Sequence, residues 1–393
     1  MANSMNKILF LRRPGAFGGI EVLLLDWLRR INYEENEVVL GSTKDYFSDA
    51  INKDGLPVVC KTLSLPVLGN FISLYKSWAT EIKNISPDKI IIMQGTIDEI
   101  PLPCVLAAHQ ATHGNVYMTE HLAAPLPPKK TSTLHYGFLP GAGIWWYKMM
   151  LMLRMRGHLA KRVLAVSEGV KNVLLMYGYP PGKITIAYHG VDASRFSPSD
   201  EKRKNWRLRY AIPEKDVVIV STARLAKEKR IESIIRAFGR LSRENGALWL
   251  MIAGDGPLRN ELENERNFLG CRDRIKLLGL VENVSELLQG SDIFVLPSDR
   301  EGLSVSLTEA MAAGLVCIAS DVSGSNEVIR DGENGFLIEP SDQGVLQGME
   351  KVLKMSDAAR NLVAQNARRS ILEHFEMKKS VTNILGLLDI KSI

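Results

Sequence analysis

Long hydrophobic runs are absent from this sequence. No stretch approaches the roughly 20 consecutive apolar residues that a membrane-spanning helix needs. The apolar run near the N-terminus, Ile8 to Leu11, is too short for the core of a signal peptide. We therefore expect a chain that does not cross a membrane, and that either stays in the cytoplasm or lies on the cytoplasmic face of a membrane.

Cysteine is scarce and scattered. The four cysteines, Cys60, Cys104, Cys271 and Cys317, are far apart and lack the spacing of metal ligands. Three of them lie in apolar runs, where a cysteine usually acts as a small buried hydrophobic residue. This pattern fits a reducing, cytoplasmic compartment.

Two ligand-binding signatures and a concentrated positive charge are also missing. The G-x-G-x-x-G spacing of a nicotinamide site does not occur, and no D-x-D triplet indicates a metal-bridged diphosphate. The net charge is only +5 over 393 residues, whereas nucleic-acid binding needs a concentrated basic stripe. We therefore expect no metal, no cofactor and no nucleic-acid partner.

Short apolar runs that alternate with amphipathic segments fill the sequence from end to end. This alternation predicts parallel strands joined by crossover helices, and hence an α/β fold. The first predicted helix runs from Ile20 to Ile31. The predicted strands are 7–13, 37–43, 58–63, 89–95, 115–121, 162–168, 184–190, 217–224, 248–254, 274–280, 293–298 and 316–321.

A polar, charged stretch, GVDASRFSPSDEKRKNWRLRYAIPEKD, marks a domain boundary near residue 190. Each half, 1–190 and 191–373, has the size of one doubly wound, Rossmann-like domain. The C-terminal helix, within about 374–393, could belong to either domain, and we expect it to pack back on the first. In such folds ligands bind beyond the carboxyl ends of the strands, and two domains facing each other enclose a cleft.

The stretch TARLAKEKR follows a predicted strand and places Arg224 and Lys229 five residues apart. Two cations at the carboxyl end of a strand can hold a pair of phosphates. The alternative is a solvated charge run at the start of a helix. The turn IAGDGP, with Gly254 and Gly256, either brings backbone amides to a ligand or is an ordinary turn from strand to helix.

Two glutamates, Glu301 and Glu309, lie eight residues apart in REGLSVSLTEAMAAG. Ser306 and Glu309 fit a capping box, which would give Glu309 a purely structural role. Glu301 precedes the helix, where a carboxylate can accept hydrogen bonds from two hydroxyls of a sugar or ribose. Further on, SGSNEVI predicts a helix start that can bind an anion, or one capped by Ser323 or Ser325.

In the first half, Gly18 and Gly19 lie between the first strand and the first helix, as in a phosphate-binding turn. His121 closes the predicted strand NVYMTEH, so we expect it at the carboxyl edge of the sheet. His109 and His113 lie on the preceding helical stretch and are predicted to be structural or surface groups.

The stretch GAGIWWYKMMLMLRMRGHLAKR is both apolar and basic. One interpretation is a core helix with one solvated side. The other is a helix lying on an anionic membrane through Trp145–Arg156, with aromatic and basic side chains acting together. The positive charge there would come from Lys148, Arg154, Arg156, Lys161 and Arg162.

Six stretches in series resemble glycosyltransferase family 4, retaining enzymes with the GT-B fold. They are RVLAVSEGVKNVL, KITIAYHGVDASRF, STARLAKEKRIESIIRAF, IAGDGP, DIFVLPSDREGLSVSLTEAMAAG and NEVIRDGENGFLI. The E-x7-E element of the family fits Glu301 to Glu309. The resemblance covers most of the chain and is strongest between about 160 and 340.

The resemblance implies a role for each matching residue. Glu301 would contact hydroxyls of the donor sugar and Glu309 the nucleotide ribose, while Arg224 and Lys229 would hold the donor diphosphate and stabilise the leaving group. His121 would lie near the donor sugar. The remaining donor-binding residues would be Gly18, Gly19, Gly254, Gly256, Ser304, Ser323 and Gly324.

The sequence departs from the family pattern at two positions. The usual glycine after the clamp lysine is Arg230 here, and the usual glycine three residues after the first glutamate is Ser304. Neither change removes a charged group, so both bear on substrate detail more than on activity.

The expected activity is transfer of a hexose or N-acetylhexosamine from a nucleotide-sugar, with UDP favoured as the nucleotide, to a saccharide or lipid-linked saccharide acceptor. Two alternatives remain: an inactive sugar-nucleotide-binding or membrane-associated scaffold, and a nucleotide-sugar epimerase of the same fold. The joint presence of Arg224, Lys229, Glu301 and Glu309 argues against the scaffold.

Overall fold

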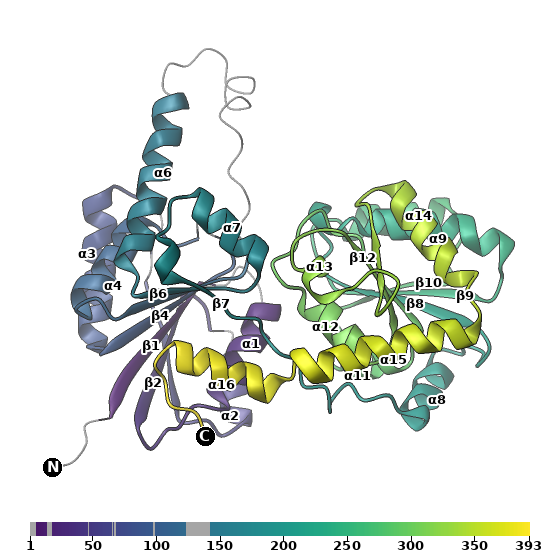
Figure 1. Cartoon of the computed structure of the whole chain (residues 1–393), viewed down its shortest axis with the longest axis horizontal. Helices are drawn as coiled ribbons and strands as arrows, with labels where there is room; N and C mark the ends of the chain where they lie inside the picture. The colour runs from purple at the N-terminus through teal and green to yellow at the C-terminus, as the bar shows by residue number, and fades with distance from the viewer. Residues whose placement is uncertain are drawn as a thin grey trace. The chain divides into compact units, whose positions relative to one another are not determined.

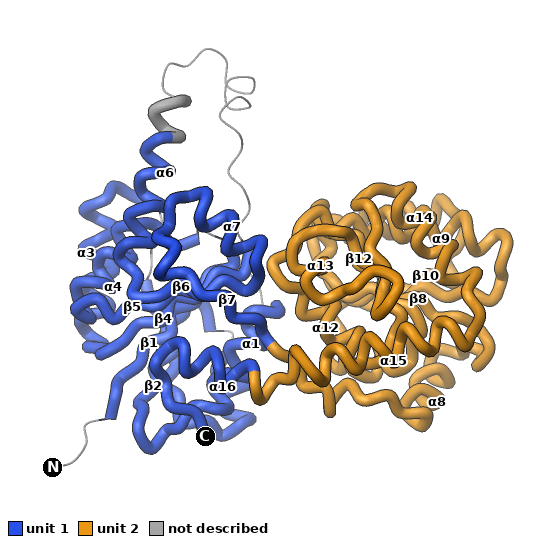
Figure 2. Tube along the Cα trace, viewed as in Figure 1, with its two compact units in different colours: residues 1–189, 380–393 blue, residues 190–379 orange. Residues whose placement is uncertain are grey.

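The computed structural model describes residues 5–13, 18–45, 47–64, 66, 68–96, 99–122 and 142–393, with the backbone alone at 142–146. The chain forms two compact units, residues 1–189 with 380–393 and residues 190–379 (Figure 2). It therefore passes from one unit to the other twice, after residue 189 and again after residue 379.

Within its described residues, unit 1 is built on a parallel sheet of seven strands in the order β3-β2-β1-β4-β5-β6-β7 (Figure 1). Its central strands are fully buried, as the run Ile90 to Met93 illustrates, because helices cover both faces of a parallel sheet. The strands are β1 Asn6–Arg12, β2 Asn36–Ser42, β3 Val58–Thr62, β4 Lys89–Gln94, β5 Val116–Glu120, β6 Arg162–Ala165 and β7 Ile184–Ile186.

The helices of unit 1 join successive strands, and α3, α4 and α6 pack side by side. The last helix, α16, begins at the end of unit 2 and continues into unit 1. The helices are α1 Gly19–Leu28, α2 Ser48–Lys53, α3 Phe71–Ile85, α4 Leu102–Ala111, α6 Ala142–Leu159, α7 Glu168–Met176, the 3-10 turn η1 Pro181–Lys183 and α16 Met377–Leu387.

Unit 2, all of whose residues are described, has a second parallel sheet with the order β10-β9-β8-β11-β12-β13. The strands are β8 Val217–Thr222, β9 Leu248–Ala253, β10 Ile275–Gly279, β11 Ile293–Leu296, β12 Val316–Ser320 and β13 Phe336–Ile338. The helices are α8 Asp200–Arg209, η2 Lys227–Lys229, α9 Ile231–Glu244, α10 Arg259–Phe268, α11 Val284–Gln289, α12 Val305–Ala312, α13 Ser325–Val328, α14 Asp342–Leu353 and α15 Asp357–His374.

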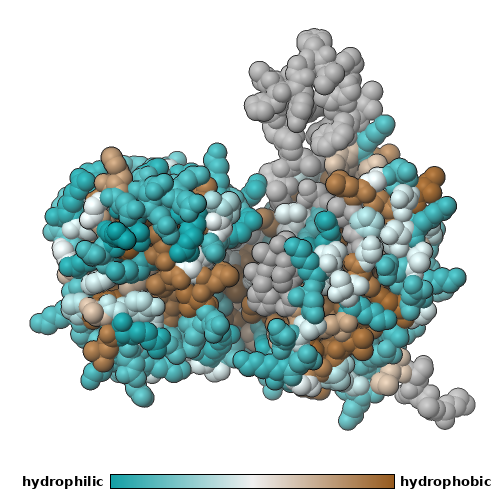
Figure 3. Space-filling view, turned by 180° about the vertical axis from the view of Figure 1, so that it is seen from behind, coloured by the Kyte–Doolittle hydropathy of each residue, from teal (hydrophilic) through white to brown (hydrophobic). Residues whose placement is uncertain are grey.

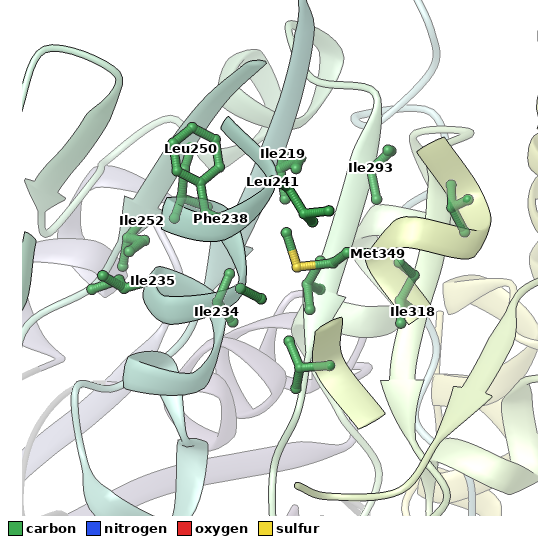
Figure 4. Packing of buried hydrophobic residues seen from close by; sticks show 14 of the residues in the cluster. Ile219, Ile234, Ile235, Phe238, Leu241, Leu250, Ile252, Ile293, Ile318 and Met349 are labelled. Carbon is green, nitrogen blue, oxygen red and sulfur yellow. The ribbon is translucent and has the colours of Figure 1, made fainter. Parts of the chain in front are cut away.

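The core of unit 2 shows why these segments adopt their structure. Helix α9 repeats apolar residues at helical spacing, so Ile234 and Phe238 lie on one side and pack on Ile219, Leu250 and other strand residues (Figure 4). Each side chain buried in this way stabilises the unit by about 1.5–3 kcal/mol. The spacing of apolar residues in α9 therefore determines which face of the helix packs on the apolar strands.

The α/β prediction is confirmed, and each predicted strand is present with bounds that differ by up to four residues. Strand β13, which has only three residues, was not predicted. The polar stretch after residue 190 includes α8, whose Arg207 is 1% exposed. Arg207 is buried because it donates to Asp292 and to the carbonyl oxygens of Gly290 and Pro213.

Each sheet has one point where the strand order reverses, between β1 and β4 in unit 1 and between β8 and β11 in unit 2. The connections leave in opposite directions there, so the carboxyl ends of the two strands flank an opening. The residues that follow β8 and β11 are therefore brought together by the topology. They include Arg224 and Lys229 after β8, and Glu301 after β11.

Candidate active site

Lys229 and Glu301 form an ion pair at the reversal point of unit 2. Lys229 Nζ lies 2.6 Å from Glu301 Oε1, and the two side chains are only 21% and 8% exposed. Lys229 is the last residue of η2, and Glu301 lies in the loop between β11 and α12. Two residues 72 positions apart are thus in direct contact, at the edge of the sheet where the sequence predicted a ligand.

Arg224 lies on the same segment as Lys229 but is much more accessible. Its side chain is 63% exposed, and its guanidinium donates to Glu228 one helical turn away. Burial alone would raise the pKa of Glu228, but its hydrogen bond to the backbone and the charge of Arg224 hold that pKa below its ordinary value. Each of the two predicted clamp cations therefore binds a carboxylate, and only Lys229 is partly buried.

Glu309 lies in α12, and the alternative in which it forms a capping box with Ser306 is wrong. The helix begins at Val305, and its N-cap is Ser304, whose Oγ accepts a hydrogen bond from the backbone amide of Leu307. The third helical position is therefore Leu307, so Glu309 is too far along the helix to bond back to its start. Glu309 is half-buried, on the helix that leads away from Glu301.

Ser304 has extended backbone angles, with φ at −82°, so nothing in this conformation requires a glycine. Serine and glycine are both accepted as N-caps, and they differ there by only a few tenths of a kcal/mol. The departure from the family pattern at this position is therefore explained by helix capping.

Gly324 brings a second loop onto the one that carries Glu301. It has φ at +83°, and a Cβ placed on it would lie 2.1 Å from the carbonyl oxygen of Gly302. It is also the N-cap of α13, which has only four residues and no side-chain cap, so the alternative in which Ser323 or Ser325 caps this helix is wrong. Both hydroxyls are instead buried, without a hydrogen-bond partner among the described residues.

Gly254 and Gly256 are required by packing. A Cβ on Gly254 would lie 1.9 Å from the carbonyl oxygen of Ala223, and one on Gly256 would lie 2.5 Å from that of Leu225. The turn after β9 is thus pressed against the segment that carries Arg224. Glycine here lets two backbones approach each other, and this explains both residues without a ligand.

In unit 1, His121 follows β5 at the carboxyl edge of the sheet, as predicted, and is 9% exposed. Its Nε2 lies 3.1 Å from Thr119 Oγ1. Burial lowers the pKa of His121 to about 3, and His189 and Arg12 add to this effect. The imidazole is therefore neutral at physiological pH, and it can serve as a hydrogen-bonding group but not as a cation.

His189 is a residue that the sequence reasoning did not single out. It lies after β7 and lines a small cavity together with His121, Thr119 and Trp27. Burial lowers the pKa of His189 to about 4. A signal was available, because the segment ITIAYHG ends a strand region with a histidine just as NVYMTEH does.

Gly18 and Gly19 lie at the start of α1. A Cβ on Gly18 would be in ordinary contact with Glu21, so packing does not require a glycine at position 18. Gly18 has φ at −160°, and its amide donates to Glu21 Oε2 at 2.9 Å. Glu21 is buried and also binds Arg12, at 2.8 Å. Arg12 in turn binds Glu99, so the reversal point of the first sheet carries one guanidinium between two carboxylates, which the sequence did not reveal.

A second buried polar group lies at the inner end of α6. Arg156 is 2% exposed and donates to Gln94 Oε1 at 2.6 Å, while Gln94 donates to Glu120 Oε1 at 2.9 Å. The prediction that Arg156 contributes to a positive surface is therefore wrong, because this guanidinium is bound inside unit 1. Residue 156 anchors the helix to β4 and β5.

The outer part of α6 is exposed. Trp145 and Trp146, which the membrane interpretation relied on, have side chains outside the described residues. The described part has four exposed large hydrophobic residues, Tyr147, Leu151, Met152 and Met155. Of the remaining predicted cations, Lys161 binds Asp389 and Arg162 donates to the carbonyl oxygen of Leu387.

His109 and His113 have structural positions. His109 Nδ1 lies 2.7 Å from the carbonyl oxygen of Leu159, which joins α4 to α6. His113 follows α4 with a left-handed backbone, φ at +50°, so it lies just beyond the helix rather than on it.

Over the described residues, no three or more His, Cys, Asp or Glu side chains are grouped so that they could hold a metal ion. None of the described helices has both the length and the apolar character needed to cross a membrane. The face shown in Figure 3 is mainly hydrophilic, with hydrophobic residues gathered in patches on each unit.

Two family models match the chain. The model for Glycosyltransferase Family 4 matches residues 17–195, and the model for Glycosyl transferases group 1 matches residues 202–370. The first match falls almost entirely on unit 1 and the second on unit 2.

Two curated proteins are similar to parts or all of the chain. N-acetyl-alpha-D-glucosaminyl L-malate synthase of Bacillus anthracis is 32% identical over 221 residues, which are 56% of this chain and 57% of that protein. UDP-Gal:alpha-D-GlcNAc-diphosphoundecaprenol alpha-1,3-galactosyltransferase of Escherichia coli is 25% identical over 401 aligned residues, 98% of this chain and 97% of that protein. The chain thus spans just over half of the first relative and nearly all of the second.

Among solved structures, Anabaena HepE in complex with UDP and glucose has the same fold. The TM-score is 0.78, and the match covers 98% of this chain and 99% of that one at 20% sequence identity. The similarity therefore extends over both units.

Proposed function

We propose a specific reaction for this chain, which belongs to glycosyltransferase family 4 and is a transferase with the GT-B fold. It transfers a hexose or N-acetylhexosamine from a UDP-sugar to a saccharide or lipid-linked saccharide, and it retains the configuration at the anomeric carbon. Its place would be in polysaccharide or glycan biosynthesis. The observation that carries the proposal is the Lys229–Glu301 pair at the reversal point of unit 2, with Arg224 and Glu309 on the same two segments.

The ion pair suggests how a donor is bound. A donor whose diphosphate meets Lys229 and whose hydroxyls meet Glu301 replaces one contact with two. Lys229 exchanges a carboxylate for a phosphate, and Glu301 exchanges the ammonium for hydroxyl hydrogen-bond donors. Arg224 is exposed and can turn toward the same diphosphate. Glu309 would bind the ribose.

The transfer step would use these charges. The bond between the anomeric carbon and the phosphate oxygen breaks, and its electron pair stays on the leaving diphosphate. Fixed cations at that oxygen stabilise the growing charge, typically by a few kcal/mol per group. In a front-face reaction the acceptor oxygen bonds to the anomeric carbon, and its proton passes to the leaving phosphate oxygen. His121, being neutral, would contribute a hydrogen bond to the sugar and not a charge.

We propose that no metal is needed, because Arg224 and Lys229 supply the positive charge that a diphosphate requires. We propose UDP as the nucleotide because the similar HepE structure holds UDP and the E. coli relative is named for UDP-galactose. The name of that relative also supports a lipid-linked acceptor.

A thermal-shift panel with UDP, GDP, ADP and their sugar conjugates tests the proposal, with and without EDTA. Ligand at about 100 times its Kd adds roughly 2.7 kcal/mol, which is several degrees in a domain of this size. We expect a shift with UDP compounds that EDTA does not change and that Arg224→Ala and Glu309→Ala abolish. Lys354→Ala is the matched control, since Lys354 also forms an exposed i, i+4 pair, with Glu350. No shift with any nucleotide would favour an inactive scaffold.

We also propose that α6 contacts an anionic membrane near the acceptor. Tyr147, Leu151 and Met155 are spaced four residues apart and therefore form an apolar stripe along the helix. These three residues and the neighbouring Met152 are 42–59% exposed, as expected of a helix that contacts a membrane surface. Vesicles containing anionic lipid should therefore sediment the protein, and Leu151→Glu with Met155→Glu should release it. Leu362→Glu, at an equally exposed leucine of unit 2, should have no effect. Equal sedimentation of all three proteins would remove the membrane proposal.

A further inference from the structure

Arg230 has a backbone conformation that is unfavourable for its residue type. It follows Lys229 directly, joins the turn η2 to helix α9, and has φ at +50° and ψ at +39°. Glycine adopts this left-handed conformation freely, whereas a residue with a Cβ is strained in it. The residue before helix α9 is therefore one where glycine would be less strained than the arginine that is present.

The side chain of Arg230 makes contacts in two directions. Arg230 Nη1 lies 3.4 Å from Asp299 Oδ1, and Nη2 lies 3.3 Å from Asp342 Oδ1. Asp342 also accepts a hydrogen bond from Ser233 at 2.5 Å and binds Arg236 at 3.1 Å. The hydrogen bond from Ser233 is the main reason why the pKa of Asp342 lies below its ordinary value, and Arg236 and Arg230 contribute. Asp342 is thus a fixed, ionised anchor.

Asp299 links this anchor to the loop that carries Glu301, two residues further on. The loops 227–230 and 299–301 are joined at three points. The backbone amide of Asp299 donates to the carbonyl oxygen of Glu228 at 2.8 Å, Arg230 binds Asp299, and Lys229 binds Glu301. The first two links involve no group that the donor is proposed to use.

We propose that Arg230 is a positioning residue, which through Asp299 keeps the Glu301 loop in register with Lys229 while these two side chains exchange their mutual contact for contacts with the donor. The inference rests on the proposed function, since it assigns Lys229 and Glu301 to the donor. The link through Arg230 persists when the Lys229–Glu301 pair opens, so the two groups stay at the spacing that the donor needs. Fixed spacing of this kind is what makes preorganised groups effective in the transition state.

A purely stabilising role does not fit the same observations. Arg230, Asp299 and Asp342 are 24%, 45% and 50% exposed, and ion pairs at that exposure contribute little to folding. The strained backbone further reduces any gain. Replacement by glycine should therefore leave the melting temperature within about 2 °C of the wild type, or raise it, because the strain is relieved as the pairs are lost.

The test compares Arg230→Gly with the wild type in UDP release from UDP-glucose. We expect kcat to fall about two- to fivefold with little change in KM, and with no loss of melting temperature, since an ion pair of this exposure corresponds to a factor of that size. Asp299→Asn should give a similar fall, and the double variant should be no slower than either alone. Arg230→Lys, which keeps the charge, should recover part of the rate. Equal kcat in Arg230→Gly and the wild type would overturn the proposal.

Arg236→Ala is the matched control. Arg236 lies on α9, which Arg230 precedes, and it also binds Asp342, but it contacts Glu265 instead of Asp299. We expect it to keep the wild-type kcat. If kcat fell as much as in Arg230→Gly, loss of any contact to Asp342 would slow the reaction. That result would reject the link through Asp299.

Hydrogen–deuterium exchange separates this inference from the proposed function. In Arg230→Gly, amides of the segment 299–304 should exchange about three- to tenfold faster than in the wild type, whichever nucleotide the protein uses. If the wild type releases no UDP but exchange is faster in the variant, the choice of donor is wrong and the link stands. If exchange in this segment is unchanged, the link does not exist.

Discussion

At the scale of single residues, the two buried histidines of unit 1 make its stability depend on pH. The folded pKa values of His121 and His189 are lowered to about 3 and about 4 by burial, while an unfolded chain binds these protons near pH 6.5. Lowering the pH from 6.5 toward 4 therefore protonates the unfolded state only, and stability falls. At pH 5 each histidine should cost unit 1 about 2 kcal/mol relative to pH 7.5.

Urea unfolding at pH 5 and pH 7.5 measures this loss directly. His121→Gln should reduce the difference between the two pH values by about 2 kcal/mol, because glutamine does not titrate. If the stability difference between pH 5 and pH 7.5 were the same in His121→Gln as in the wild type, this imidazole would bind its proton equally in the folded and unfolded states.

Gly324 offers a second prediction at this scale, with a control built into the chain. Gly324→Ala adds a Cβ 2.1 Å from a carbonyl oxygen in a residue with φ at +83°, whereas Gly332→Ala has nearly the same φ, +78°, and nothing within 4 Å. The Gly332 variant should lose only the strain of a left-handed residue, about 1 kcal/mol, and the Gly324 variant should lose at least about 2 kcal/mol more. Chemical denaturation measures both. Equal losses would mean that the loop at Gly302 moves aside freely.

Single residues also show where sequence reasoning was effective. Lys229 and Glu301 could be predicted because both follow apolar strands, and parallel strands place their carboxyl ends at one edge. The contacts of Arg230 with Asp299 and Asp342 could not be predicted. These residues are 69 and 112 positions away in the sequence, and the local sequence pattern does not indicate such distant side-chain contacts. The contact between Lys229 and Glu301 is observed, but the roles in donor binding of these two residues and of His121, Arg224 and Glu309 remain predictions.

At the scale of elements, α6 depends on one buried charge. Arg156→Met removes the guanidinium that lies 3.8 Å from the buried carboxylate of Glu120, so that carboxylate loses its positive neighbour. We expect a loss of about 3–5 kcal/mol in the stability of unit 1, the usual result of breaking a buried pair on one side. Arg154→Met, on the exposed side of the same helix, should change stability little. Thermal unfolding measures the melting temperatures of the two variants, and we expect that of Arg156→Met to be clearly lower. Equal melting temperatures would contradict the role of Arg156 as an anchor.

Elements were predictable to the extent that their residues were apolar. A strand such as β4, buried from Ile90 to Met93, is a continuous apolar run because both of its faces are covered. Strand β13 has only three residues, and α8 has a polar sequence with Trp206 and Arg207 buried. The burial of Arg207 depends on carbonyl oxygens at distant positions, and composition does not reveal those.

At the scale of the whole molecule, the last segment of the chain completes unit 1. Leu385 is fully buried, and the carbonyl oxygens at the end of α16 are bound by Lys89 and Arg162. Leu385→Ala should therefore destabilise unit 1 by about 2–5 kcal/mol, as large-to-small changes in a core do. Leu387→Ala, at a half-buried position of the same helix, should cost less.

Scanning calorimetry can locate the effect of Leu385→Ala. The transition that shifts should be that of unit 1, and the transition of unit 2 should keep its temperature, because residue 385 belongs to unit 1 alone. A shift of the unit 2 transition instead would contradict the assignment of residues 380–393.

The two passages between the units also make unit 2 an insertion within unit 1. On the side of unit 1, Ser380 Oγ donates to the carbonyl oxygen of Tyr188 at 2.6 Å. On the side of unit 2, the amide of Val191 donates to the carbonyl oxygen of Phe375 at 2.9 Å. The severed ends of either unit would therefore be neighbours. Residues 190–379 could therefore be exchanged for the matching segment of a relative while unit 1 is kept, with the second junction placed inside α16, Met377–Leu387.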